Sequence, residues 1–169
     1  MLDENDREQA GGDRQIISSK EEARAAVVTV AALANRGLAI LTPDLEPDIY
    51  DHDDFLETLK KFLLARSFAR VRVLISEPSR TLKIGNRFVD MGRRLNSYIE
   101  FRNMKPELRH HSEAFCLADD RAIMFRSRAD RWEGMLGTHE PAVTKKYLDI
   151  FDELWQACEV ASELRQLQV

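Results

Sequence analysis

The sequence predicts a single α/β domain with a mixed sheet flanked by helices, its parallel strands early in the chain and an antiparallel hairpin late. Short apolar runs alternate with helix-period segments along most of the chain, which is typical of strands joined by helical crossovers. Two apolar runs, 114–118 and 121–126, flank the turn-forming pair Asp119 and Asp120 and predict the hairpin. A length of 169 residues with 44% hydrophobic residues suits one domain with a sizeable core.

The chain is predicted to lead from a polar tail into a helix. Residues 1–15 are mainly polar and are expected to form a disordered tail, so the domain spans 16–169. Ser19 and Glu22 have the spacing of a helix capping box. The helix that they open is expected to end just before Gly37, a typical stop residue.

The remaining elements follow from apolar periodicity and from turn residues. A helix with Phe55, Leu59 and Phe62 on its core face begins at Asp51 or Asp53, since either residue suits an N-cap. The elements expected in order are a strand over 38–42, that helix to about residue 67, a strand over 71–75, a helix over 80–95 capped by Ser79, a strand over 98–102, the hairpin, a strand or ordered loop over 132–136 and a helix over 141–165.

Charge is unevenly distributed along a chain whose net formal charge is −4. Residues 1–60 carry a net charge of −8, residues 61–131 carry +8, and residues 132–169 carry −4. A positive middle in an acidic chain indicates a local anion-binding surface rather than a general affinity for nucleic acid.

No sequence feature points to a membrane, to export or to a bound metal. The N-terminus lacks the basic and apolar regions of a signal peptide, and no apolar run reaches the ~20 residues of a membrane helix. Cys116 and Cys158 lie in apolar patterns without metal-ligand spacing and are expected to be reduced core residues. We therefore expect a cytoplasmic protein with no cofactor, no metal and no membrane partner.

Several acidic and basic residues allow both a functional and a structural interpretation. Asp44 follows a strand end, where α/β proteins place ligands, and it suits a loop carboxylate equally. Arg126 and Glu133 are expected to form an ion pair, which either faces a ligand or only supports the fold. The acidic residues of the segment 51–54 favour a helix dipole more than a metal site.

A basic stripe is predicted within the helix expected over 80–95. Arg80, Lys83, Arg87 and Arg94 recur at helical spacing and suit contacts with phosphate groups. No aromatic residues are interleaved with them, so a base-stacking surface is not indicated, and a solvated helix face is the structural alternative.

Two adjacent histidines, His110 and His111, stand at the entry of the predicted hairpin. On an extended chain they point to opposite faces, which suits one surface position and one loop contact better than a shared metal ion. The order of elements, with a histidine-led hairpin carrying aspartate at its turn, resembles one half of a phospholipase D-like protein over roughly residues 20–165.

That family carries a His-x-Lys motif, an aspartate after four further residues, and a Gly-Ser-x-Asn after the turn. The resemblance implies a histidine that attacks phosphorus, a lysine that holds phosphate oxygens, and two half-domains that complete one site. Set from His111, the motif places Glu113 at the lysine and Ala118 at the aspartate, one residue before Asp119. The segment 125–129 stands where Gly-Ser-x-Asn is expected. Because Glu113 reverses the charge of the lysine, the pattern disfavours a phosphoanion.

The chain is also similar to a bacterial group of phospholipase D-like domains that lack the full motif. The stretches that carry this likeness are Thr42-Pro43-Asp44-Leu45, Tyr50-Asp51 and Trp132-Glu133-Gly134. The likeness implies the fold and no particular reaction.

The leading prediction is therefore a phospholipase D-like half-domain that acts as a non-catalytic binding or regulatory module for a small ligand or a protein partner. The resemblance implies a symmetric homodimer with the hairpin near its interface. The predicted pocket comprises Asp44, His110, His111, Glu113, Asp119, Arg126 and Glu133. The alternatives are a divergent phosphodiesterase with His110 or His111 as nucleophile, and anion or nucleic-acid binding through Arg80, Lys83, Arg87 and Arg94.

Overall fold

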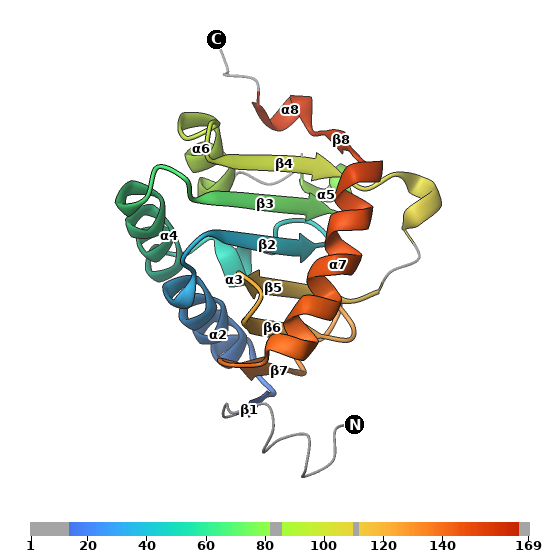
Figure 1. Cartoon of the computed structure of the whole chain (residues 1–169). Coiled ribbons are helices and arrows are strands. Elements are labelled where there is room, and N and C mark those ends of the chain that lie inside the picture. Colours follow the sequence, from blue (N-terminus) through green and yellow to red (C-terminus); the bar gives the residue numbers. More distant parts are fainter. Residues whose placement is uncertain (1–13, 82–85, 110–111, 166–169) are drawn as a thin grey trace.

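A mixed β-sheet with helices on both of its faces forms the body of the molecule (Figure 1). The computed structural model describes residues 14–81, 86–109 and 112–165. Within these residues the sheet has eight strands in the order β1-β7-β6-β5-β2-β3-β4-β8. The strands are β1 Arg14–Ile17, β2 Gly37–Thr42, β3 Arg70–Ile75, β4 Ile99–Asn103, β5 Ala114–Ala118, β6 Ala122–Arg126, β7 Gly134–Gly137 and β8 Glu159–Val160.

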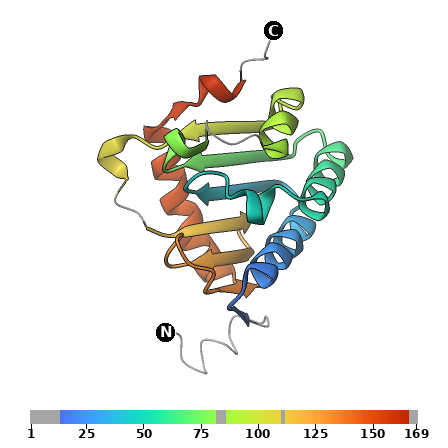
Figure 2. The same cartoon turned by 180° about the vertical axis from the view of Figure 1, so that it is seen from behind.

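A single long helix, α7, crosses one face of the sheet, while α2 and α4 lie on the other, as the view from behind shows (Figure 2). Among the described residues, no helix is long and apolar enough to cross a membrane. The helices are α2 Lys20–Leu33, α3 Pro47–Tyr50, α4 Asp53–Ala65, α5 Pro78–Thr81, α6 Arg87–Arg94, α7 Pro141–Ala157, α8 Ser162–Arg165 and the 3₁₀ turn Pro106–Leu108.

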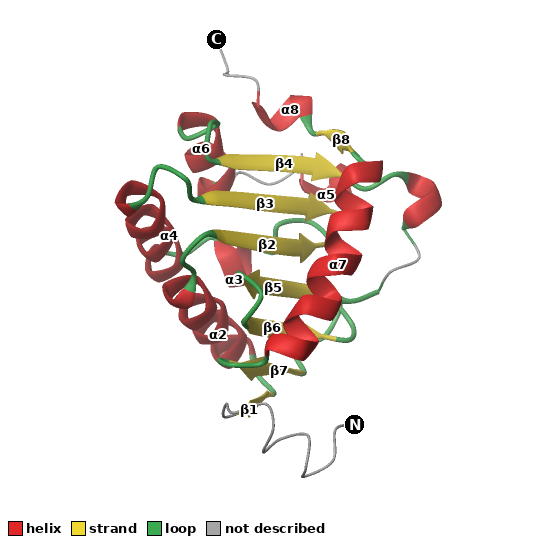
Figure 3. Cartoon of the chain, in the orientation of Figure 1, coloured by secondary structure: helices red, strands yellow, loops and turns green. Residues whose placement is uncertain are grey.

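The strand directions agree with the sequence-based prediction (Figure 3). β2 pairs in parallel with β3, and β3 in parallel with β4, whereas β5 is antiparallel to β2 and to β6. The fold is thus an α/β fold with a mixed sheet, and the hairpin lies directly beside the parallel strands.

β2 lies at the centre of the sheet and is buried on both faces, as expected of a strand covered by helices on each side. Leu38 and Ile40 pack in the core beneath α2 and α4. Ala39 and Leu41 pack in the second core, beneath α7. The ends of β2 are therefore fixed firmly enough to position loops for a functional site.

The turn between β5 and β6 is tied to the start of β2 by one carboxylate. Asp119 adopts a φ of 53°, a left-handed conformation that aspartate tolerates. Its carboxylate accepts hydrogen bonds from the backbone amides of Asn35, Arg36 and Gly37 at 2.9, 2.7 and 2.9 Å. The loop contains Arg121 as well as the predicted pair Asp119 and Asp120, and β6 begins one residue later than expected.

The start of α2 confirms the predicted cap, and its end does not. Ser19 Oγ accepts a hydrogen bond from the Glu22 amide at 3.1 Å and donates one to the Glu22 carboxylate at 3.2 Å. The helix ends at Leu33, with Ala34 as its C-cap. Gly37, expected to be the stop residue, is the first residue of β2, because the Asp119 carboxylate draws the 35–37 amides toward the hairpin.

The start of α4 differs from the prediction. His52, in an extended conformation, is its N-cap, and no side chain caps the helix. Asp51 and Asp53, each expected as a possible cap, instead bind the Arg87 guanidinium, at 2.8 and 2.6 Å. The ion pair joins α4 to α6, a contact between elements that local spacing does not reveal.

The helix expected over 80–95 is wrong as a single element. The segment forms the short helix α5, which contains Ser79, and the separate helix α6. Asn86 caps α6, since its side-chain oxygen accepts hydrogen bonds from the amides of Phe88 and Val89 at 2.8 and 3.4 Å. An asparagine cap thus starts a new helix within a segment whose residues have helical spacing.

The helix expected over 141–165 ends early, at Ala157. Cys158 is extended, and Glu159 and Val160 form β8, which pairs with the end of β4. A backbone hydrogen bond of 2.9 Å from Ala161 to Phe101 continues this contact. Because β4 would otherwise be an edge strand, its free backbone groups stabilise the extended form.

The N-terminal boundary also lies earlier than expected. Arg14 and Gln15, assigned to the tail by the sequence, belong to β1 and pair with β7. The Arg14 guanidinium also forms an ion pair with the buried carboxylate of Glu140. The rest of the expected tail, 1–13, lies outside the described residues.

Both cysteines are free and buried, in agreement with the prediction of core residues. Burial raises the pKa of the Cys116 thiol to about 12. At neutral pH this thiol is protonated and behaves as a small apolar side chain.

Replacement of Asp119 is expected to loosen the hairpin from β2. Asp119→Ala removes the acceptor for three backbone amides and should lower the free energy of unfolding by about 2 kcal/mol. Asp119→Asn keeps an acceptor oxygen and tolerates the left-handed backbone, so it should lose less than half as much. Urea unfolding followed by circular dichroism measures both, and equal losses would contradict this account.

Candidate functional site

The loop that follows the carboxyl end of β2 has an unusual backbone. Leu45 and Glu46 adopt φ angles of 67° and 29°, so two consecutive residues other than glycine lie in the left-handed region. Such residues cost about 1–3 kcal/mol each, and they cluster at functional sites. The Leu45 side chain is fully buried, and the Asp44 carboxylate accepts a hydrogen bond of 3.1 Å from the Glu46 amide. The surrounding contacts therefore hold this loop in place.

The conformation of this loop directs Glu46 to a buried arginine. Arg126, the last residue of β6, is only 1% exposed, and its guanidinium forms an ion pair with the Glu46 carboxylate. Thr42, the last residue of β2, donates a hydrogen bond of 2.9 Å to the same carboxylate. The carboxyl end of β2 and the end of β6 are thereby joined by charge.

The same guanidinium organises the loop after β6. Arg126 Nη1 donates hydrogen bonds to the carbonyls of Ala129 and Arg131, at 3.0 and 2.9 Å. The ring of Trp132 lies with its centroid 5.9 Å from the guanidinium carbon. Three segments that are distant in the sequence, around residues 46, 126 and 130, therefore share one buried cation.

Burial dominates the electrostatics beneath this loop. It raises the pKa of Glu46, and the Arg126 guanidinium opposes that rise by stabilising the carboxylate. Burial likewise raises the pKa of Tyr50, which is fully protonated at neutral pH. A neutral phenol thus lies within electrostatic reach of the Arg126–Glu46 ion pair.

A cleft of about 260 Å³ opens beside the ion pair, and we call it the carboxyl-edge cleft. Five of its lining residues are acidic, one is an arginine and one is Trp132. The arginine, Arg80, pairs with Glu77 and lies 3.6 Å from Asp44. The lining residues are Pro43, Asp44, Glu46, Pro47, Asp48, Glu77, Arg80, Ala129, Asp130 and Trp132. The cleft is therefore negatively charged on balance.

The structure brings together only part of the predicted pocket. Asp44 and Arg126 lie at the same edge of the sheet, at the ends of β2 and β6. Glu133 is exposed, and the expected ion pair between Arg126 and Glu133 is wrong because Arg126 binds Glu46. The loop 43–46 brings Glu46 to the Arg126 guanidinium, although Glu133 is closer to Arg126 in the sequence.

Two other predicted pocket residues do not line this cleft. Glu113 lies at the same edge of the sheet, since the next residue, Ala114, pairs with Arg126, but it is on the side of α7, where its charge adds to the effect of burial in raising the pKa of Tyr147. Asp119 lies at the opposite end of β2, bound to the amides of 35–37. His110 and His111, the candidate nucleophiles, lie outside the described residues.

The predicted basic stripe does not form one helix face. Arg80 belongs to α5, where it pairs with Glu77 and Asp44, and Arg87 belongs to α6, where it pairs with Asp51 and Asp53. Arg94 is exposed on α6, and Lys83 lies outside the described residues. Two of the four cations are thus neutralised by carboxylates.

Sequence reasoning missed Glu46, although a signal for it exists. Arg126 shares the strand parity of Met124, which is buried in the core beneath α2, so the alternation places a charged side chain in the interior. A buried cation needs an acidic partner, and the loop after the strand predicted over 38–42 contains two acids, Asp44 and Glu46, at the strand end where α/β folds place ligands. Only the left-handed backbone of Leu45 and Glu46 decides which acid is used.

Comparison with protein families matches residues 19–167 to a domain of unknown function, DUF7931. The chain belongs to the DUF7931 family. A comparison with curated proteins finds no match.

Solved structures identify the fold of this DUF7931 chain. Nuc from Salmonella typhimurium, a phospholipase D family member, matches with a TM-score of 0.62 and 15% identity over 88% of this chain and 97% of that chain. TrmBL2, an archaeal chromatin protein, matches with a TM-score of 0.63 and 12% identity, over 88% and 53% of the two chains. Phosphatidylserine synthase from Haemophilus influenzae Rd KW20 matches with a TM-score of 0.56 and 14% identity, over 92% of this chain and 41% of that chain. These likenesses establish a phospholipase D-like α/β fold.

The described part of the DUF7931 chain contains no group of three or more histidine, cysteine, aspartate or glutamate residues able to hold a metal ion. The acidic residues of the carboxyl-edge cleft are spread along its walls, and Asp44 and Glu77 already share Arg80. The arrangement suits recognition of a charged group, because fixed carboxylates surround one aromatic ring.

The buried ion pair can be tested by a double-mutant cycle. Arg126→Met and Glu46→Gln each leave an unpaired buried partner and should each lower the free energy of unfolding by about 3–5 kcal/mol. The double variant should lose clearly less than the sum, as measured by urea unfolding. Arg87→Met, which breaks an exposed ion pair, is the matched control and should cost far less. Additive losses would show that Arg126 and Glu46 do not depend on each other.

Proposed function

We propose that this chain is a non-catalytic binding or regulatory module that acts as a homodimer and holds a basic group in its carboxyl-edge cleft. The observation that carries this proposal is the set of contacts made by Arg126, which lies in the segment where the family resemblance places Gly-Ser-x-Asn. Its guanidinium is engaged by Glu46 and by the carbonyls of Ala129 and Arg131. This cation therefore serves the loop structure and does not face a substrate phosphate.

The charge of the surrounding residues supports the same proposal. If the family motif is set from His111, Glu113 takes the lysine position, and setting it from His110 gives Ser112, so neither register supplies the lysine. Glu113 lies on the side of the sheet that faces α7. Asp44 and Glu77 share Arg80, and Asp130 pairs with Arg128, yet the cleft lining still holds five acidic residues and one arginine, an excess of negative charge that disfavours a phosphodiester. A site that stabilises a phosphoryl transition state needs the opposite sign of charge.

The cleft has the features that recognise a cation. Asp44 retains 17% exposure of its side chain, and Glu77 retains 51%, so both carboxylates reach an incoming ligand. Trp132 offers an aromatic face, and a cation that is desolvated against such a ring gains about 2 kcal/mol. We infer that an ammonium or guanidinium group, from a small ligand or a partner protein, is the chemistry that fits.

The homodimer rests on the size of the chain. It spans almost the whole of Nuc but less than half of the phosphatidylserine synthase chain, so it corresponds to one unit of this fold. The resemblance to phospholipase D-like proteins implies that two such units face each other across their carboxyl edges. In this chain that arrangement would bring the carboxyl-edge clefts of the two copies close to the dimer interface, near the hairpins.

Binding of a polyamine tests the proposed ligand chemistry. Spermidine should change the fluorescence of Trp132 in a Trp155→Phe background, with an affinity that falls as salt rises. Asp44→Asn combined with Glu77→Gln should weaken this binding at least tenfold. Glu153→Gln, which removes an exposed charge from α7, is the matched control and should leave it unchanged.

Two outcomes would overturn the proposal. Spermidine that binds the double variant as tightly as the unaltered chain would remove the cleft from consideration. Hydrolysis of bis(p-nitrophenyl) phosphate that is abolished by His111→Ala would instead establish the phosphodiesterase alternative.

The oligomeric state is tested by sedimentation velocity at micromolar protein. A homodimer predicts a species of twice the 19.5 kDa chain mass. The dimer should persist in Asp44→Asn/Glu77→Gln if the clefts bind ligand rather than each other. A single species of monomer mass at all concentrations would contradict this part of the proposal.

A further inference from the structure

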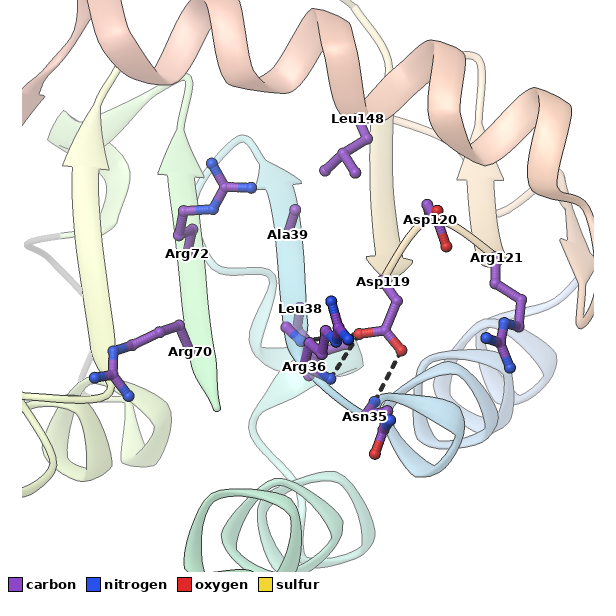
Figure 4. A pocket seen from close by; sticks show the side chains of 11 residues that line it. Asn35, Arg36, Leu38, Ala39, Arg70, Arg72, Asp119, Asp120, Arg121 and Leu148 are labelled. Carbon is purple, nitrogen blue, oxygen red and sulfur yellow. Dashed lines mark hydrogen bonds between the residues drawn. The ribbon is translucent and has the colours of Figure 1, made fainter. Parts of the chain in front are cut away.

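A second and larger cavity lies at the opposite end of the sheet from the carboxyl-edge cleft, and we call it the amino-edge pocket. Its volume is about 590 Å³, within the range of about 300–1,000 Å³ that is typical of small-molecule sites. It opens at the starts of β2 and β3, beside the turn between β5 and β6 (Figure 4). Its lining residues are Asn35, Arg36, Gly37, Leu38, Ala39, Arg70, Arg72, Asp119, Asp120, Arg121 and Leu148.

Four arginines contribute to this lining: Arg36 precedes β2, Arg70 and Arg72 belong to β3, and Arg121 lies in the turn between β5 and β6. Figure 4 shows Arg36 between the start of β2 and the β5–β6 turn, with Arg70 on one side of it and Arg121 on the other. Arg72 lies beneath α7, near Ala39. Only two acidic residues face them, so the lining has an excess of two positive charges.

Two of these arginines have no side-chain partner among the described residues. Arg72 binds Asp152 at 2.7 Å, and Arg70 donates to the carbonyls of Ser67 and Ala69 at 2.9 and 2.8 Å. The guanidinium groups of Arg36 and Arg121 form no such contact within 14–81, 86–109 and 112–165, and both residues are exposed. Each can therefore bind an external anion without first breaking an internal ion pair.

The nearest carboxylate does not neutralise these arginines. Asp119 uses both of its carboxylate oxygens to accept hydrogen bonds from the amides of residues 35–37. These three amides stabilise its negative charge where it stands. Asp119 thus fixes the backbone that carries Arg36, and its carboxylate oxygens are engaged by backbone amides rather than by an arginine side chain.

The pocket also offers a fixed cation and an apolar wall. The guanidinium of Arg72 lies 5.0 Å from the ring centroid of Phe151 and 5.7 Å from that of Trp155, so its position is set before any ligand arrives. Leu148 of α7 and Ala39 of β2 supply apolar surface beside it. An anion with an organic body matches this combination better than a bare inorganic ion.

We propose that the amino-edge pocket binds an organic diphosphate of about the size of a nucleoside diphosphate. Guanidinium groups recognise phosphate oxygens through paired hydrogen bonds, and arginines on both sides of Arg36 provide for two phosphate groups. The carboxyl-edge cleft, of opposite charge, lies at the other end of β2. This site is therefore independent of the function proposed above.

Calorimetric titration with adenosine diphosphate tests this inference on the full chain. Adenosine diphosphate should bind, with an affinity that falls at higher salt, and adenosine should not. Arg36→Gln combined with Arg121→Gln should weaken binding at least tenfold. Because neither side chain has a partner, this variant should unfold at the same temperature as the unaltered chain when no ligand is present.

Arg94→Gln is the matched control, since it removes an exposed arginine from α6, away from the pocket, and it should bind adenosine diphosphate normally. Three results would overturn the inference. They are the absence of binding by adenosine diphosphate at millimolar concentration, equal binding of adenosine, and an equal loss of affinity in Arg94→Gln and in the double variant.

Discussion

The ion pair between Arg126 and Glu46 is the constraint on which the carboxyl edge of this molecule depends. A buried guanidinium cannot remain unpaired, because the loss of its hydration would cost several kcal/mol. Glu46 meets that need only because the loop after β2 enters the left-handed region at two successive residues. The unfavourable backbone conformation of Leu45 and Glu46 is therefore offset by the pairing of the buried Arg126 charge.

Arg126 also holds the loop that follows β6. Two loop carbonyls, of Ala129 and Arg131, accept hydrogen bonds from its guanidinium, and the central carbon of that group lies over the ring of Trp132. In this way the segment after β6 is placed over the segment after β2. Arg126 is thus a structural centre of this edge, and the carboxylates around it set the charge of the cleft.

The two ends of the sheet carry opposite charge. Acidic side chains line the carboxyl-edge cleft, whereas arginines line the amino-edge pocket. The charge distribution along the sequence anticipates a local anion-binding surface in the basic middle segment. Two of the arginines expected to form it, Arg80 and Arg87, bind aspartate and glutamate instead. Two arginines without a side-chain partner among the described residues, Arg36 and Arg121, lie at the amino-edge pocket.

The sequence by itself determined the fold class, the hairpin, the capping box of α2 and the parallel core strands, because these depend on apolar periodicity and on cap and turn residues that act locally. Only the tertiary structure decided the break at Asn86, the extension of Cys158 into β8 and the pairing of Arg126 with Glu46 rather than Glu133. It also separated Asp119 from Asp44 by the full length of β2. These outcomes depend on contacts between distant segments, where a free strand edge or a buried charge selects its partner in space.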